Sequence, residues 1–163
     1  MTEIKKIHWN GFLKHCIDQY PKEACGFLFS KMPFSLEEEW YVFSVENISK
    51  NPLEQWIPHK KGMGQVKNKA VKMGLVKIGN IHTHPYPEGE KITNDVIEDF
   101  LLPSPEDLRF ARKHNDIVRG IIVCDKEHNY AILFHDKFGN NLKIIATGIT
   151  YYTGIEPKEL NEK

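Results

Sequence analysis

The sequence contains few cysteines, and none of them stand at metal-binding spacing. Its three cysteines, Cys16, Cys25 and Cys124, are odd in number and widely separated, and no C-x-x-C pair occurs. A disulfide framework or a thiolate zinc site is therefore not expected. Free cysteines of this kind are most often small core residues, and we expect these three to be buried.

Two further features are absent: an excess of charge of one sign and a long apolar run. The 22 basic and 22 acidic side chains cancel, and no block of like charge occurs. This balance disfavours a nucleic-acid partner, which would select a basic face. No segment reaches the length of a membrane span, and the first residues, MTEIKKIHWNGF, contain no apolar signal core. We therefore expect a cytoplasmic protein with no nucleic-acid or membrane partner.

The chain is long enough for one domain with a substantial core. Its 163 residues, 40% hydrophobic and 27% charged, are ordinary for a globular protein. Helical and strand patterns alternate without repeats or linkers, which predicts an α/β (α+β-like) layer domain over residues 1–155. Residues 156–163 are expected to be a flexible tail. The sequence gives no indication of the oligomeric state.

Hydrophobic periodicity and turn residues predict the individual elements. Pro21 ends the first helix, and Gly74 suits the C-terminal cap of the second. The expected helices span 9–20, 65–74 and 104–115. The expected strands span 24–29, 39–48, 76–84, 116–125, 129–136 and 141–152, with a brief edge strand at 54–58.

His82 and His84 stand one residue apart at the end of a predicted strand, directly before Pro85. Alternate residues of a strand point to the same face, so the two imidazoles lie side by side. Such a pair supplies two ligands for zinc, which needs at least a third from the protein. A surface histidine pair that binds no metal explains this motif alone equally well.

Two acidic motifs flank this strand in the sequence. Ser104-Pro105-Glu106-Asp107 has the pattern of a capped helix start, although Asp107 also suits a metal ligand aimed across a cleft. Glu23 precedes an apolar strand, where a glutamate is usually solvated. If that strand pairs with the histidine-bearing one, Glu23 reaches the same rim and can carry protons for an open zinc site.

These motifs together resemble the JAMM signature of the MPN-domain (JAB) metalloproteases. That signature is a glutamate upstream of H-x-H-P, followed by S-x-x-D. It is matched here by Glu23, by Ile-His-Thr-His-Pro at 81–85 and by Ser104 with Asp107. The similarity extends over roughly residues 4–150. It implies a curved mixed β-sheet flanked by helices, with the metal at the sheet edge.

The resemblance also implies the role of each residue. His82, His84 and Asp107 would bind one Zn²⁺ per chain. Glu23 would accept a proton from the zinc-bound water and donate it to the leaving amine, and Ser104 would hydrogen-bond the oxyanion. Zinc lowers the pKa of its bound water from about 15.7 to about 7. An oxyanion donor typically contributes a few kcal/mol of transition-state stabilisation.

The sequence departs from the family in the segment between the proline and the serine. Residues 86–103 separate the two, a longer segment than is usual in the family. Thr93 and Asp95 lie nearer the usual position, but they break the S-x-x-D spacing that Ser104 and Asp107 keep. We therefore interpret 86–103 as an insertion beside the active site: a lid, a docking element or a passive loop.

The resemblance implies a zinc-dependent peptidase or isopeptidase. Its substrates would be conjugates of a ubiquitin-like or sulfur-carrier protein, and its short form resembles the prokaryotic members. Two alternatives remain open: a non-catalytic MPN module that scaffolds an assembly or binds a ubiquitin-like partner, and a zinc hydrolase of non-protein amides. Among the other polar and aromatic residues, we expect Trp9, Trp40 and Trp56 to be core or interface anchors and His59 to lie in an exposed loop.

Overall fold

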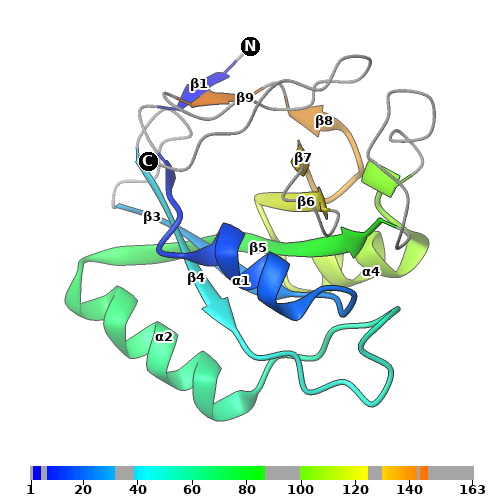
Figure 1. Ribbon diagram of the computed structural model, residues 1–163. Coiled ribbons are helices and arrows are strands. Elements are labelled where there is room, and N and C mark those ends of the chain that lie inside the picture. Colours follow the sequence, from blue (N-terminus) through cyan, green and yellow to red (C-terminus); the bar gives the residue numbers. More distant parts are fainter. Residues whose placement is uncertain are drawn as a thin grey trace.

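A computed structural model describes residues 2–4, 7–31, 39–86, 100–124, 130–142 and 144–146 (Figure 1). The expected domain boundary at 155 and the tail 156–163 lie outside these residues, as does most of the segment 86–103. In the described part, no helix has both the length and the apolar character needed to cross a membrane.

The chain alternates between short helices and strands, as the hydrophobic periodicity predicts. The strands are β1 (Thr2–Ile4), β2 (Ile7–His8), β3 (Cys25–Lys31), β4 (Trp40–Val45), β5 (Leu75–Pro85), β6 (Val118–Cys124), β7 (Tyr130–His135), β8 (Asn141–Leu142) and β9 (Ile144–Ala146). The helices are α1 (Phe12–Gln19), α2 (Lys60–Lys72) and α4 (Pro105–Lys113).

Seven of the strands form one mixed sheet in the order β2-β4-β3-β5-β6-β7-β8. β5 pairs with β3 antiparallel and with β6 parallel, so the histidine-bearing strand is central. The parallel pair β5 and β6 is connected through α4, which lies beside the end of β5 (Figure 1). β1 and β9 form a separate two-stranded parallel sheet. The mixed sheet flanked by helices confirms the fold class expected from the sequence.

Both faces of the sheet are buried, because helices cover each of them. On one face α1 packs Phe12, Leu13 and Cys16 against inward side chains such as Leu28 and Ile81. On the other face α2 covers an aromatic cluster of Phe27, Phe29, Tyr41 and Phe43. A third cluster on the face of the histidines joins Tyr86 and Leu101 to Ile121, Val123 and Leu133.

Gly79 permits a close approach between β5 and its parallel neighbour. A Cβ atom at this position would lie 1.6 Å from the backbone oxygen of Val118. The antiparallel ladder on the other side of β5 shifts its register between Leu28 and Phe29, next to this point. The glycine in the predicted strand is therefore required by backbone packing at an irregularity of the sheet.

Three of the expected elements differ from the structure. Helix α2 begins at Lys60 and not at 65, because the His59 side chain caps it by accepting a hydrogen bond from Gly62 N at 3.2 Å. His59, which was expected in an exposed loop, is thus the N-cap residue of α2. Residues 54–58 form no strand and contribute one isolated bridge, Asn47 to Pro58. The expected strand 141–152 is two short strands in different sheets as far as residue 146, beyond which the chain is not described.

Candidate metal centre

The end of the central strand β5 brings two imidazoles to the rim of the sheet. His82 and His84 project from the same face, and their Nε2 atoms lie 3.1 Å apart. Pro85 is the last residue of the strand, as expected. The His82 side chain is 1% exposed and that of His84 19%, so both side chains are largely buried.

Asp107 completes the cluster from the first turn of α4. Its Oδ1 lies 3.2 Å from His82 Nε2, and its Oδ2 lies 3.4 Å from His84 Nε2. The same carboxylate closes a capping box: Ser104 N donates to Asp107 Oδ2 at 2.9 Å, and Asp107 N donates to Ser104 Oγ at 3.1 Å. The helix-start and metal-ligand interpretations of S-x-x-D are therefore compatible, since one carboxylate serves both.

The geometry of these three side chains fits zinc. Two ligands of a tetrahedral zinc ion with bonds of about 2.0–2.1 Å lie about 3.3–3.4 Å apart. The three separations are 3.1, 3.2 and 3.4 Å. His82, His84 and Asp107 form the cluster of three potential ligands found among the described residues. Two imidazoles and one carboxylate are also the donor set of open, three-ligand zinc sites.

Hydrogen bonds and ring contacts orient both imidazoles. His84 Nδ1 lies 2.5 Å from the carbonyl oxygen of Phe100, to which its N–H donates, so that Nε2 presents its lone pair to the cluster. The His82 ring stacks on Trp56 with centroids 5.6 Å apart, and Trp56 in turn contacts Phe110 edge-on. His82 Nδ1 has no hydrogen-bond partner among the described residues.

The three potential ligands differ in the direction in which their surroundings shift the pKa. Burial alone would raise the pKa of the Asp107 carboxyl, but the hydrogen bonds with His82 and His84 outweigh it and hold this pKa well below its ordinary value. Burial lowers the pKa of His82 to about 4, so that ring is neutral at physiological pH. Burial alone would also lower the pKa of His84, but the hydrogen bonds with Asp107 and Phe100 outweigh it and raise this pKa, so a metal ion competes with a proton at this ring.

Glu23 reaches this site because β3 pairs with β5. The register places Cys25 opposite His82. Two hydrogen bonds between Ala24 and Thr83 continue it: Thr83 N donates to Ala24 O at 2.9 Å, and Ala24 N donates to Thr83 Oγ1 at 2.8 Å. Glu23 directly precedes Ala24 and lies close enough to His84 and Asp107 for their charges to affect its pKa. The condition set by the sequence, that the two strands are neighbours, is met.

Burial dominates the electrostatics of Glu23. It is 7% exposed, and burial is the main cause that raises its pKa to about 7. The charge of His84 lowers this pKa in part, whereas those of Asp107 and Glu54 raise it further. A carboxyl group with a pKa near neutrality can both accept and release a proton at physiological pH.

An open cleft of about 360 Å³ connects these groups. Glu23, His84, Ser104 and Asp107 all line it, together with Trp56 and other residues of the loop between β4 and α2. The Ser104 hydroxyl oxygen accepts the capping hydrogen bond, and its own O–H remains able to donate into the cleft. The structure thus brings together all five residues singled out in the sequence.

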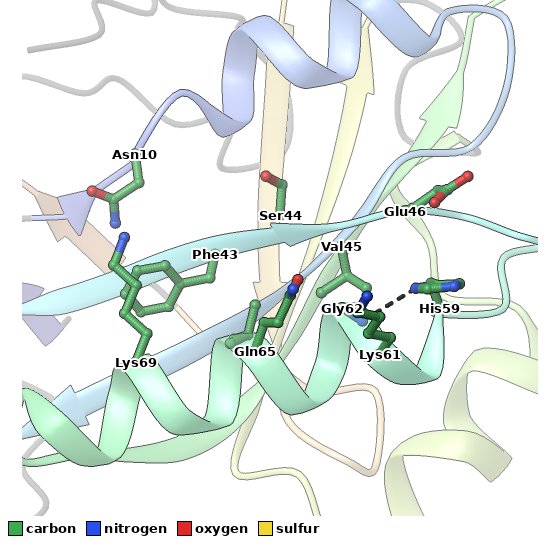
Figure 2. Close-up of a pocket in the computed structure, with 11 residues that line it drawn as sticks. Asn10, Phe43, Ser44, Val45, Glu46, His59, Lys61, Gly62, Gln65 and Lys69 are labelled. Atoms are coloured by element: carbon green, nitrogen blue, oxygen red, sulfur yellow. Dashed lines mark hydrogen bonds between the residues drawn. The ribbon is translucent and has the colours of Figure 1, made fainter.

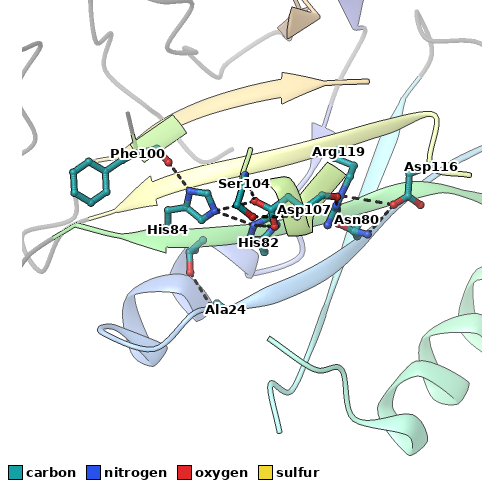
Figure 3. A network of polar contacts seen from close by, with 10 residues as sticks. Ala24, Asn80, His82, His84, Phe100, Ser104, Asp107, Asp116 and Arg119 are labelled. Atoms are coloured by element: carbon teal, nitrogen blue, oxygen red, sulfur yellow. Dashed lines mark hydrogen bonds and ion pairs between the residues drawn. The ribbon is translucent and has the colours of Figure 1, made fainter. Parts of the chain in front are cut away.

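Sequence reasoning missed three residues that build the site. Trp56 was expected as a core or interface anchor, yet it lies over His82. Thr83, between the two histidines, fixes the strand end that carries Glu23. Arg119, fully buried on β6, donates hydrogen bonds to Asn80 Oδ1 at 2.8 Å and to the carbonyl oxygen of Asp107 (Figure 3). The alternation of strand residues could have pointed to Thr83. Nothing in the sequence points to Arg119 before the strand register is known.

A second cavity of about 610 Å³ lies between α2 and β4 (Figure 2). Its lining combines the apolar side chains of Phe43, Val45 and Val66 with polar groups of α2. Of the groups able to bind a metal, it contains Glu46 and His59, and the His59 side chain already caps α2. This larger cavity is therefore not the metal centre.

The fold and the site together define a protein of the JAB/MPN class. Residues 5–90 match the profile of the prokaryotic homologs of the JAB domain, which covers more than half of the chain. The chain therefore belongs to the prokaryotic JAB family. The matched region contains Glu23, His82 and His84, whereas Ser104 and Asp107, which were proposed from the S-x-x-D motif, lie beyond it.

Solved structures show the same fold at low sequence identity. A Desulfitobacterium hafniense protein solved in solution matches with a TM-score of 0.57 and 21% identity, over 90% of this chain and 93% of its own. A JAB1/MPN domain protein from Archaeoglobus fulgidus matches with a TM-score of 0.52 and 15% identity, over 86% and 97%. A search of curated proteins gave no significant match.

Proposed function

We propose that this chain is a zinc-dependent peptidase or isopeptidase. One observation carries the proposal: a buried glutamate, Glu23, lines the same cleft as His84 and Asp107, two of the three converging metal ligands. A scaffold needs neither the ligands nor the buried carboxyl group, whose desolvation lowers the stability of the fold. A hydrolase needs both.

His82, His84 and Asp107 would hold the zinc ion. When bound there, zinc supplies Lewis acidity, which lowers the pKa of a coordinated water and polarises a carbonyl group. Membership of the JAB family, the 3.1–3.4 Å ligand separations and the orientation of His84 by Phe100 support this assignment.

Side chains of the protein carry out the proton transfer and stabilise the oxyanion. Glu23 takes a proton from the attacking water and returns it to the leaving amine, a role that suits its pKa of about 7. Ser104 donates its free O–H to the oxygen of the scissile carbonyl as negative charge develops there. Trp56 and Phe110 form an aromatic wall on the cleft beside His82.

We further propose that the substrate is a protein joined to the C-terminus of a ubiquitin-like or sulfur-carrier protein, and that the enzyme acts in the cytoplasm. The support is family membership together with the shape of the site. The cleft is open, and its volume of about 360 Å³ lies at the lower end of the range for small-molecule pockets. Because the cleft is open, it can admit an extended chain segment.

The test is cleavage of a panel of ubiquitin-like proteins extended beyond a C-terminal Gly-Gly, with the zinc-loaded wild type and the Glu23→Gln variant. The glutamine keeps the size of the side chain but accepts no proton. We expect the wild type to cleave at least one member and Glu23→Gln to cleave it at least about a hundredfold more slowly, at unchanged zinc content.

Glu54→Gln is the matched control, because Glu54 is an exposed carboxylate that lines the same cleft. It should retain most of the activity. Equal rates for the wild type and Glu23→Gln would contradict the mechanism. A wild type that binds a member of the panel and cleaves none would support the non-catalytic alternative.

A further inference from the structure

Arg119 joins the helix that carries the third ligand to the strand that carries the other two. It lies on β6 and pairs with Asn80 of β5, two residues before the pair of His82 and Ile121. Its Nε donates to Asn80 Oδ1 at 2.8 Å, and its Nη1 donates to the carbonyl oxygen of Asp107 in the first turn of α4 (Figure 3).

The same pair of residues also holds the far end of α4. Asn80 Nδ2 donates to Asp116 Oδ2 at 3.0 Å, and Asp116 N donates to the carbonyl oxygen of Ala111 at 3.0 Å. Asn80 stands two residues before His82, so its side chain projects from the same face of the strand. Helix α4 is thus attached at its first turn to Arg119 and just beyond its last turn to Asn80.

The burial of Arg119 is not explained by a large contribution to the stability of the fold. The side chain is 0% exposed, and its one ion-pair partner among the described residues is Asp116, whose Oδ2 lies 3.7 Å from Nε. Its Nη2 has no hydrogen-bond partner in the described part of the chain. Well-packed apolar side chains often stabilise such a site at least as well as a buried ion pair.

We propose that Arg119 is a positioning residue for the metal centre. By hydrogen-bonding Asn80 and the Asp107 carbonyl group at once, its guanidinium group fixes the position of α4 along β5. It thereby sets the separation between the Asp107 carboxylate and the two imidazoles. The inference rests on the metal centre of the proposed function, and it assigns Arg119 no contact with the metal or the substrate.

The test is the Arg119→Lys variant, measured without any substrate. Lysine keeps the charge beside Asp116, but its single ammonium group cannot reproduce the planar guanidinium group with its two hydrogen bonds. We expect the metal-free variant to unfold at a temperature close to that of the wild type. Its zinc affinity, measured by competition with a chromophoric chelator, should fall about 10–100-fold, as for other residues that orient metal ligands. The visible absorption bands of its Co²⁺ form should shift, because the ligand geometry changes.

Arg112→Lys is the matched control, since Arg112 is exposed on the same helix and should change neither readout. If Arg119→Lys does not fold, Arg119→Met/Asp116→Asn removes both buried charges together and is judged by the same two measurements. Wild-type zinc affinity and an unchanged Co²⁺ spectrum in the folded variant would overturn the inference. A wild type that binds neither metal would instead overturn the metal centre of the proposed function.

Discussion

Ser104 and Asp107 exchange two hydrogen bonds, each backbone amide donating to the other's side chain at 2.9 and 3.1 Å. The S-x-x-D spacing is therefore the spacing of a capping box, in which N-cap and third helical residue bond reciprocally. The box holds the Asp107 carboxylate at the start of α4, where it faces His82 and His84. Helix initiation and ligand placement depend on the same four residues.

Replacing Asp107 with asparagine separates these two uses. Asparagine keeps an oxygen that can accept from Ser104 N, but it loses the charge that binds the metal. We expect Asp107→Asn to keep the fold and to lose tightly bound zinc, as His82→Ala should, whereas the wild type holds one zinc per chain by elemental analysis. His59→Ser is the control, because it removes a histidine and retains a side chain that caps α2. Full zinc occupancy in either ligand variant would show that a ligand has been misassigned, and Asp95 would then be examined first.

Ser104→Ala should affect stability and rate separately. Loss of an N-cap side chain lowers the free energy of unfolding by about 1 kcal/mol. Loss of an oxyanion donor slows catalysis by about 100–1000-fold when the donor is fully engaged. Denaturant unfolding and the cleavage rate, both measured well below the melting temperature, distinguish the two effects. A stability change without a rate change would restrict Ser104 to its capping role.

Part of the segment 86–103 is structural. Tyr86 and Leu101 are 2% and 3% exposed, and the carbonyl oxygen of Phe100 holds His84 Nδ1. Replacing only residues 87–99 with a short Gly/Ser loop should therefore leave the zinc affinity unchanged, whereas replacing all of 86–103 should weaken it. Chelator competition on the two variants measures the difference. Loss of zinc in the shorter replacement would place a ligand within 87–99.

The parts of the site that follow from local pattern were predictable from the sequence. Alternation places His82 and His84 on one face, and the capping signature places Asp107 one turn into a helix. Both inferences need only short-range geometry. The pairing of the strand after Glu23 with β5 was left as a condition, because β4 and α2 separate the two strands in the sequence.

The remaining parts depend on register and on contacts between distant segments. Arg119 meets Asn80 only because β6 pairs with β5 in one particular register after the α4 connection. Trp56 reaches His82 from a loop whose predicted strand does not form. The start of α2 was misplaced because Gly62 and Gly64 weaken the helical pattern, while the capping histidine at 59 extends the helix over them. Propensity and periodicity contain no information on such contacts.

Cysteine chemistry should be absent from the site. Cys25 is 1% exposed, its Sγ contacts the carbonyl oxygen of Val45 at 3.3 Å, and burial raises its pKa to about 12, with a further contribution from Glu23. Cys16 and Cys124 are buried as well, as expected from the sequence. Iodoacetamide should therefore leave the native protein unmodified and its zinc content unchanged, and it should label the thiols after unfolding in guanidinium. Rapid labelling of Cys25 in the native state, with loss of activity, would indicate a thiol mechanism.

Glu23 should make the metal-free protein less stable as the pH rises. Its pKa is about 7 in the folded chain against an ordinary value of 4.5, so folding favours the protonated form. The stability that this group supports is fully present below about pH 4.5 and is lost as the pH rises to about 7. The loss is up to about 3 kcal/mol, by the linkage between pKa and folding.

The prediction is tested by denaturant unfolding of chelator-treated protein between pH 4.5 and 8. Glu23→Gln carries no ionisable group there, so the stability difference between variant and wild type should grow with pH and level off above about pH 7. Glu54→Gln is again the control, because Glu54 is exposed and its charge contributes least to the raised pKa of Glu23, so the stability difference of this variant should grow far less with pH. A difference that stays constant with pH would mean that Glu23 has the same pKa in the folded and the unfolded chain, and is therefore ionised in the folded protein at neutral pH. Its burial would then be offset by a cation or donor near the cleft, and its assignment as the proton carrier would lose its electrostatic basis.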